Sequence, residues 1–360
     1  MSRSRAIALG WFLLGLSFAL LALGVCVGSL GFENLWQPLL DSQAPQVERD
    51  MAWHIVTDIR LPRTLGAWTA GALLGLAGAL AQGLFRNPLA DPYLLGSASG
   101  ASLGVALMLA ALGAGTGLAD SAWVQPETVV SMFSGSLWVR LGLTGAAFGG
   151  AVIAVLLTLA LARGVGHTMR LLLAGVVVGV VLGALTSLVM LFSPSSLQAM
   201  QAFLLGSTSF VGWNALALMA SVWLLASAVA WPMARVLDGL SLGEATAASL
   251  GLPLRPLRAA LVGVLALATA TAVAQTGLIA FVGLAAPHLV RVVTRVPHRP
   301  LLWLSSGMGG VLLTAADVLA RWLIAPQELP VGVLTAVLGG GYLLWLMHRR
   351  TALLQTGGGG

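Results

Sequence analysis

Residues 171–192 read LLLAGVVVGVVLGALTSLVMLF and contain no charged side chain. As a helix this stretch would rise about 33 Å, which is enough to cross the hydrocarbon core of a bilayer. The rest of the chain has a similar character, since 58% of its 360 residues are hydrophobic and only 8% are charged. An ordinary soluble domain has about 25% charged residues. The sequence therefore predicts an integral membrane protein.

Further apolar runs flank this stretch on both sides. Seven of them are long enough to span a bilayer as single helices, and they cover residues 6–30, 64–85, 94–112, 138–162, 213–233, 301–319 and 331–347. An eighth run, 259–293, would extend about 52 Å as one helix. It is expected to break at Gly277, Gly283 or Pro287, giving one span to about Ala280 and a short second one over residues 281–293. We predict an all-α polytopic membrane protein of about ten transmembrane helices in one bundle.

The domain organisation follows from these runs. Residues 1–350 are expected to form a single transmembrane domain, and the glycine-rich residues 351–360 a flexible tail. The run 6–30 is longer than the apolar part of a signal peptide, which has about 7 to 15 residues. It is therefore expected to remain as the first span.

Charge sets the expected orientation. With the N-terminus inside, the cytoplasmic side receives 13 of the 18 basic residues and three of the 12 acidic ones. The positive-inside rule then places both termini in the cytoplasm. Because this asymmetry accounts for the net charge of +6, no nucleic-acid partner is needed to explain it.

Glycines recur at four-residue spacing in several spans. Such stripes let helix backbones approach closely. Packing within the bundle is the first interpretation, and a subunit interface or a pathway lining stays open; the stripes are Gly71 and Gly75, Gly96, Gly100 and Gly104, Gly145 and Gly149, and Gly175, Gly179 and Gly183.

Several chemistries are excluded by missing residues. The chain has no lysine, so it cannot contain the lysine of a Walker A loop, and an ATP-driven transporter would need a separate motor. One cysteine, Cys26, allows no cysteine-based metal cluster. No nucleophile and base constellation supports an enzyme. An ion-coupled carrier would need ionisable residues deep in its spans, where His288 is the one candidate, and it is expected instead to cap backbone groups at a break at Pro287.

The segment between the sixth and seventh spans carries the marks of a short helix outside the bilayer. Ser241 can cap its start, Glu244 follows three residues later, and Gly251 can close it. Two interpretations are open, an interfacial helix on lipid headgroups and a docking element for an external motor.

Several motifs together resemble one family. They are Arg60-Leu61-Pro62-Arg63, the run GLFRNPLADP at 83–92 with Leu95-Gly96, the run GLIAFVGL at 277–284 with Pro287-His288 and Arg291, Ala316-Asp317 with Arg321, and Glu328-Leu329-Pro330-Val331-Gly332. This set is similar to the signature of the FecCD-type permeases, the ABC-importer subunits that carry ferric siderophores, haem or cobalamin. The resemblance spans residues 6–350.

The resemblance implies partners. FecCD-type permeases form homodimers with a pathway at the two-fold axis, two ATPase subunits on the cytoplasmic side and a periplasmic binding protein on the other. The family's coupling helix, which contacts the ATPase, corresponds to Gly243, Glu244, Ala245 and Thr246.

The resemblance also assigns a role to three arginines. In related cobalamin permeases, arginines at the positions of Arg60, Arg63 and Arg321 meet glutamates on the two lobes of the binding protein. Their predicted places near span ends on the external side fit this docking role, because an arginine fork matches a carboxylate. Snorkelling to lipid headgroups is the alternative.

A third group of residues is expected near the pathway. The fifth span and residues 195–205 resemble the family's pathway-lining helix and a short re-entrant helix. The candidate lining residues are Met190, Ser193, Met200, Gln201 and Ser207, with ordinary packing as the alternative.

Together these features predict the permease subunit of a bacterial inner-membrane ABC importer for an iron chelate, either haem or a ferric siderophore. Cobalamin is the alternative cargo, and an ion-coupled carrier or channel is a remoter one. No permanently bound cofactor or metal is expected.

Overall fold

The computed structural model describes residues 2–28, 31–33, 37, 39, 41, 45–115, 137–163, 168–249 and 253–356. Its helices are α1 (Ser2–Cys26), α3 (Gln46–His54), α4 (Leu61–Phe85), α5 (Ser97–Gly115), α7 (Leu137–Leu161), α8 (Thr168–Phe192), α9 (Leu197–Leu205), α10 (Trp213–Ser241), α11 (Glu244–Ser249), α12 (Leu254–Thr276), α13 (Val282–Val293), α14 (His298–Trp322) and α15 (Val331–Thr356). A π-helix, η1 (Ile55–Arg60), joins α3 to α4, and two 3₁₀ turns are η2 (Pro92–Leu95) and η4 (Pro194–Ser196). The short strands β1 (Val27–Gly28) and β2 (Gly31–Phe32) pair antiparallel.

The number of spans agrees with the prediction of about ten. In the described part of the chain, seven helices are long and apolar enough to cross a membrane, and three shorter apolar helices overlap α5, α13 and α15. Each of them overlaps one of the predicted apolar runs, although the helical segment that contains α4 begins at Gln46, before the predicted run 64–85. The all-α bundle is thereby confirmed.

Glycine lets two helix pairs approach closely. A Cβ atom on Gly71 of α4 would lie 2.2 Å from the carbonyl oxygen of Gly309 on α14. A Cβ atom on Gly100 of α5 would lie 2.3 Å from the carbonyl oxygen of Gly150 on α7. Two of the predicted stripes therefore pack within the bundle. Gly145, Gly149 and Gly183 have no neighbour within 4 Å of such an atom, so the other interpretations stay open there.

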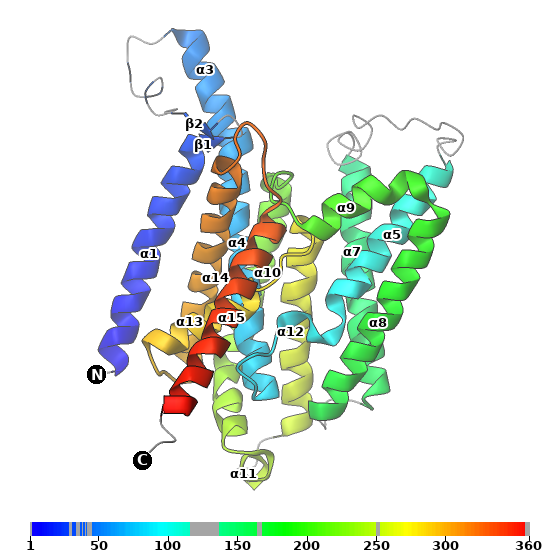
Figure 1. Cartoon of the computed structure of the whole chain (residues 1–360), viewed down its shortest axis with the longest axis vertical. Coiled ribbons are helices and arrows are strands. Elements are labelled where there is room, and N and C mark those ends of the chain that lie inside the picture. Colours follow the sequence, from blue (N-terminus) through cyan, green and yellow to red (C-terminus); the bar gives the residue numbers. More distant parts are fainter. Residues whose placement is uncertain are drawn as a thin grey trace.

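The bundle divides into two groups of helices around α12. Figure 1 shows α4 and α14 at the centre of one group, with α1 on its outer side, and α5, α7 and α8 side by side in the other. The first group packs on α12 through α4 and α10, and the second through α7 and α5. Helix α4 is buried along almost its whole length.

The predicted break in residues 259–293 lies at its first candidate. Helix α12 ends at Thr276, and Gly277 and Phe281 both have positive φ angles. Pro287 does not interrupt the helix, because α13 continues through it. His288 is accordingly not a cap at a break; it lies buried inside α13 with its ring edge-on to Tyr342, 5.8 Å away.

Two ends of the bundle can be distinguished. Both chain termini and α11 lie at one end in Figure 1, while β1, β2 and α3 lie at the other. We call these the α11 end and the β1 end. Helix α15 continues to Thr356, past the start of the predicted tail, and residues 357–360 lie outside the described part.

Candidate functional site

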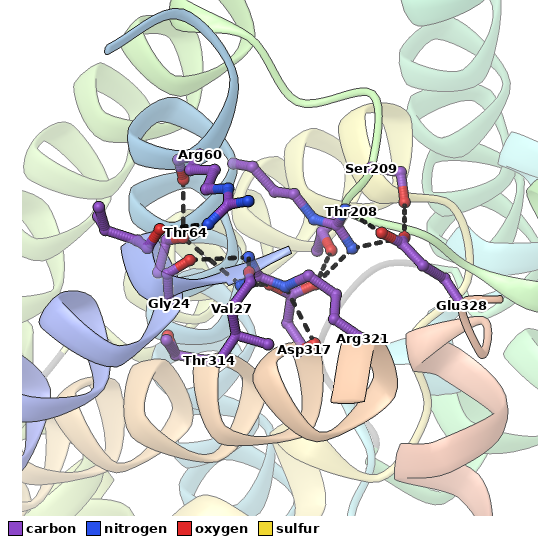
Figure 2. A network of polar contacts seen from close by, with 12 residues as sticks. Gly24, Val27, Arg60, Thr64, Thr208, Ser209, Thr314, Asp317, Arg321 and Glu328 are labelled. Carbon is purple, nitrogen blue, oxygen red and sulfur yellow. Dashed lines mark hydrogen bonds and ion pairs between the residues drawn. The ribbon is translucent and has the colours of Figure 1, made fainter. Parts of the chain in front are cut away.

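A network of buried charges lies at the β1 end of the bundle, where α1, α4, α14 and the start of α15 meet. Figure 2 shows it around Arg60, Asp317, Arg321 and Glu328, with Thr208 reaching in from the segment after α9. We call this group, together with Arg63 and Glu33, the arginine network. All three arginines predicted to dock a partner protein belong to it.

Asp317 is the centre of the arginine network. Its side chain is fully buried in α14, and one helical turn further on, Arg321 Nη2 donates to its Oδ2 at 2.5 Å. Arg63 Nη2 donates to its other oxygen at 3.1 Å, and the Thr208 hydroxyl donates to that same oxygen. Two guanidinium groups and one hydroxyl therefore compensate a single buried carboxylate.

Arg321 is bound within the chain on every side. Its Nη1 donates to the carbonyl oxygens of Gly24 and Val27, at 2.9 and 2.8 Å. Its side chain is 1% exposed. Because Gly24 and Val27 lie at the end of α1 and in β1, Arg321 fixes the end of the first span against α14.

Arg63 has a second partner, which it binds at two points. Its Nη1 and Nη2 donate to the two carboxylate oxygens of Glu328, at 3.0 and 2.9 Å. Ser209 also donates to Glu328, at 3.0 Å. The side chain of Arg63 is 12% exposed and that of Glu328 23% exposed, so this pair is more accessible than the buried pair of Asp317 and Arg321. Such two-point pairs combine charge with fixed geometry.

Arg60 completes the arginine network beside α1. Its Nη1 donates to the carbonyl oxygen of Val25 at 2.9 Å, and its Nη2 pairs with Glu33. The residue is buried. The network thus balances three arginines with three carboxylates, and in this conformation none of the three arginines snorkels to a bilayer surface. Docking of a partner by them stays a prediction.

The sequence indicated the partner of only one of these arginines. Asp317 and Arg321 are four residues apart, a spacing that allows an ion pair on one helix face. Glu33 and Glu328 are 27 and 265 residues from their arginines, and no local pattern connects them. Burial of the arginines was missed for the same reason.

Below the arginine network, three chain segments are joined by hydrogen bonds between their backbones. Ser207 N donates to Thr276 O at 2.8 Å, and Leu278 N donates to Phe203 O at 3.1 Å. Gly332 N donates to Gly206 O at 3.3 Å. We call this the backbone crossing. It ties the end of α9, the break after α12 and the start of α15 together.

A small cavity of about 70 Å³ opens beside the backbone crossing. Its lining comes from α7, α9, α12 and the segment after α9, and includes Thr144, Phe203, Ser207, Phe210 and Gln275. The lining mixes apolar side chains with the polar groups of Thr144, Ser207, Gln275 and Thr276.

The five predicted pathway residues have different surroundings. Only Ser207 lines this cavity. Met200 is 1% exposed and packs with residues of α5 and α12, so it fills the core and does not face a pathway in this conformation. Met190 and Ser193 are half-buried, and Gln201 is exposed.

The predicted coupling segment forms a short helix at the α11 end, as Figure 1 shows. Ser241 does not start it, since α10 runs through Ser241 and the Ser241 hydroxyl donates to Asp238 O. Gly243, at φ +110°, makes the turn into α11. Ala247 is buried against the bundle and Thr246 is exposed, while the side chains of Glu244 and Ala245 and the whole of Gly251 lie outside the described part.

A pair of side chains holds the base of this segment. His298 Nδ1 lies 2.6 Å from Asp238 Oδ1, and the His298 backbone N donates to the same oxygen at 3.0 Å. The end of α10 is thereby fixed to the start of α14. Among the described residues no group of three or more histidine, cysteine or acidic side chains is placed to hold a metal ion.

Known proteins with similar sequences are transport permeases. The hemin transport system permease protein HmuU of Yersinia pestis is 36% identical over 323 residues, which cover 89% of each chain. The cobalamin import system permease protein BtuC of Halobacterium salinarum is 38% identical over 303 residues, 84% of this chain and 75% of that one.

A solved structure shares the fold. It is described as an inward-facing conformation of a metal-chelate type ABC transporter, and it superposes with a TM-score of 0.75 at 27% identity, covering 94% of this chain and 99% of that one. The model of the FecCD transport family matches residues 13–349. The chain therefore belongs to the FecCD transport family.

Proposed function

We propose that this chain is the permease subunit of a bacterial ABC importer that moves an iron chelate, either haem or a ferric siderophore, across the inner membrane. The observation that carries the proposal is the similarity to the hemin permease along 89% of both chains. The shared fold with a metal-chelate type transporter supports it. The absence of lysine excludes a Walker A site within this chain, so a separate ATPase supplies the energy.

The ATPase docks at the α11 end. Helix α11 projects beyond the spans there, and the exposed Thr246 is available to a partner. The buried Ala247 and the Asp238–His298 pair connect α11 to α10 and α14. Movement of a docked motor is therefore passed on to two long spans, which fits a rigid-body switch between outward and inward access.

A periplasmic binding protein docks at the β1 end. Arg60, Arg63 and Arg321 are engaged by the chain's own carboxylates, so docking proceeds by exchange of ion-pair partners. Glu328 and Glu33 are the partly exposed members, and carboxylates of the binding protein would replace them. Arg321 acts indirectly, by holding Asp317 and the end of α1.

Two copies of the chain form the pathway between them. Helix α8 exposes a series of large apolar side chains, among them Val176, Val180 and Leu188, which either a second copy or lipid can cover. The cavity beside Ser207 is a candidate part of the pathway lining. Both termini lie at the α11 end, which is the cytoplasmic end in this proposal.

Cobalamin is the second candidate cargo. The observation that favours it is the 38% identity to cobalamin permeases of Halobacterium and of Salmonella typhi. Cargo choice depends on the binding protein as well, so the permease alone does not decide between the two.

Reconstituted uptake tests the proposal. The chain is purified with its ATPase and binding protein, placed in liposomes, and supplied with haem, a ferric siderophore or cobalamin in parallel. ATP-dependent uptake of haem or the siderophore is expected. Uptake of cobalamin alone would establish the alternative, and uptake that proceeds without the ATPase would reject the importer class.

A further inference from the structure

A second hollow lies far from the proposed pathway, between α1 and α10. It is an open groove of about 450 Å³, and both helices beside it pack on α4 and α14. It faces outward from the bundle, since Trp11 at its edge is 70% exposed. The residues that matter for its chemistry are Gly10, Trp11, Trp68, Trp223, Trp303 and Gly307.

Three tryptophans that line this groove, Trp68, Trp223 and Trp303, belong to a row of four that ends at Trp231. The ring centroids of Trp68 and Trp223 are 5.5 Å apart, those of Trp223 and Trp303 6.1 Å, and those of Trp303 and Trp231 5.7 Å. Each pair meets edge to face, the favoured arrangement of aromatic rings. We call this row the tryptophan ladder. It runs from α4 to α10, then to α14, and returns to α10 at Trp231.

The ladder turns its polar atoms inward. The indole Nε1 of Trp68 donates to Ser17 Oγ at 3.0 Å, and that of Trp223 donates to Ser306 Oγ at 2.8 Å. At membrane surfaces tryptophan usually points its N–H group toward the headgroups. Here two of the four donors are satisfied within the protein, so the groove presents ring carbons to its surroundings.

A cation stands at one end of the ladder. The guanidinium carbon of Arg299 lies 5.2 Å from the ring centroid of Trp231. Within the described part of the chain, Arg299 has no carboxylate partner and its Nε atom is buried without a hydrogen-bond acceptor. Stacking on a ring uses the face of a guanidinium and leaves the N–H groups at its edge available for an anion.

Arg299 and the groove lie along the same face of α14. Arg299, Trp303 and Gly307 are spaced four residues apart on α14, so they share a face over about 12 Å. Arg299 is in the first turn of α14, at the end where the chain's N-terminus lies. The exposed Arg3 and Arg5 begin α1 at this same end.

We propose that this groove binds one anionic phospholipid, with an acyl chain along the tryptophan ladder and the phosphate at Arg299. The groove lies between helices that are apolar enough to span the membrane, so the bilayer surrounds it. The positive end selects a negative headgroup, and the α11 end faces the leaflet that carries anionic lipids when the termini are cytoplasmic. An acyl chain alone would not require the cation.

Quenching of tryptophan fluorescence tests this site. The full-length protein in nanodiscs is given phosphatidylglycerol or phosphatidylcholine with brominated acyl chains, which quench indoles in contact with them. We expect phosphatidylglycerol to be preferred about fivefold, because its headgroup has a net negative charge whereas that of phosphatidylcholine is zwitterionic, and one basic residue near an anionic lipid contributes about 1 kcal/mol. Arg299→Gln should remove that preference, whereas Arg295→Gln, an exposed arginine in the loop before α14, should keep it.

A second variant tests the groove itself. A Cβ on Gly10 would meet only Leu304, at 3.8 Å, so Gly10→Leu adds bulk to the groove without a backbone clash. Quenching by both lipids should fall relative to Gly263→Leu, a site on α12 with open space around it. Equal quenching by the two headgroups in the unmodified protein would overturn the proposal. Unchanged quenching in Gly10→Leu would also overturn the proposal, because it would show that lipid does not occupy the groove.

Discussion

Arg63 and Glu328 form a two-point ion pair across 265 residues of sequence, with N–O distances of 3.0 and 2.9 Å. The pair joins the start of α4 to the segment before α15. Ser209 and Asp317 bind it from the segment after α9 and from α14. Four separate parts of the chain therefore depend on one guanidinium group at the β1 end.

Changing either member of this pair should shift binding-protein affinity in opposite directions. Arg63→Gln removes the cation that a partner carboxylate would bind, so docking should weaken about tenfold or more. Glu328→Gln removes the charge that pairs with Arg63 within the chain. A carboxylate of the binding protein then competes more easily for Arg63, so docking should tighten. Surface plasmon resonance with the purified binding protein measures both. Weaker docking in both variants would show that the pair acts only by maintaining structure.

The buried centre of the arginine network should be sensitive to a neutral substitution. Asp317→Asn leaves Arg63 and Arg321 without their shared carboxylate, and breaking a buried pair in this way costs about 3–5 kcal/mol. Thermal unfolding in detergent should show the loss. Asp58→Asn, at an exposed carboxylate of the same end, is the matched control and should change stability little. A small effect of Asp317→Asn would mean that water reaches the network.

The contact between α4 and α14 should not tolerate a larger side chain. Gly71→Leu drives a side chain into the backbone of Gly309, since its Cβ alone would lie 2.2 Å from the carbonyl oxygen. Overpacking of this kind costs about 1–3 kcal/mol or more. Gly15→Leu on α1, where no atom lies within 4 Å, should leave the melting temperature nearly unchanged. Comparable melting of the two variants would contradict the close approach.

Coupling to the ATPase should depend on the α11 segment. Glu244→Arg reverses a charge in the segment proposed to contact the motor, and should reduce ATP hydrolysis stimulated by the loaded binding protein by at least tenfold. Glu48→Arg, a change of the same kind on α3 at the opposite end, should retain stimulation. Copurification of the permease with its ATPase shows whether the variant complex still assembles. Full stimulation of ATP hydrolysis in Glu244→Arg would contradict the proposal that this segment contacts the ATPase.

Hydropathy predicted the spans well, because a segment that enters lipid must be apolar along its own length. It did not predict that the helix before α4 starts at Gln46. Residues 46–60 contain five charged side chains among apolar ones, and their helix extends beyond the apolar run. The break at Gly277 was one of three candidates, and only backbone geometry separates it from Gly283 and Pro287.

The site was predicted in part, and its electrostatics were not. Sequence motifs and family resemblance brought Arg60, Arg63 and Arg321 together, and the structure places all three in one network. The carboxylates that pair with two of them come from distant loops, where no periodic pattern exists. Burial depends on how the helices pack together, which the sequence does not show. The three arginines were therefore expected at the surface, whereas the structure encloses them.

The backbone crossing has a consequence for divergence among relatives. Its three hydrogen bonds join main-chain atoms of Ser207 and Thr276, Leu278 and Phe203, and Gly332 and Gly206. These hydrogen bonds do not depend on which side chains are present, except that Gly206, Gly277 and Gly332 must stay small because backbone atoms lie against them. Neighbouring positions that line the cavity, such as Thr144 and Gln275, are then free to change by mutation while the junction keeps its shape. If the cavity belongs to the proposed pathway, its side chains can differ between relatives while the scaffold stays the same.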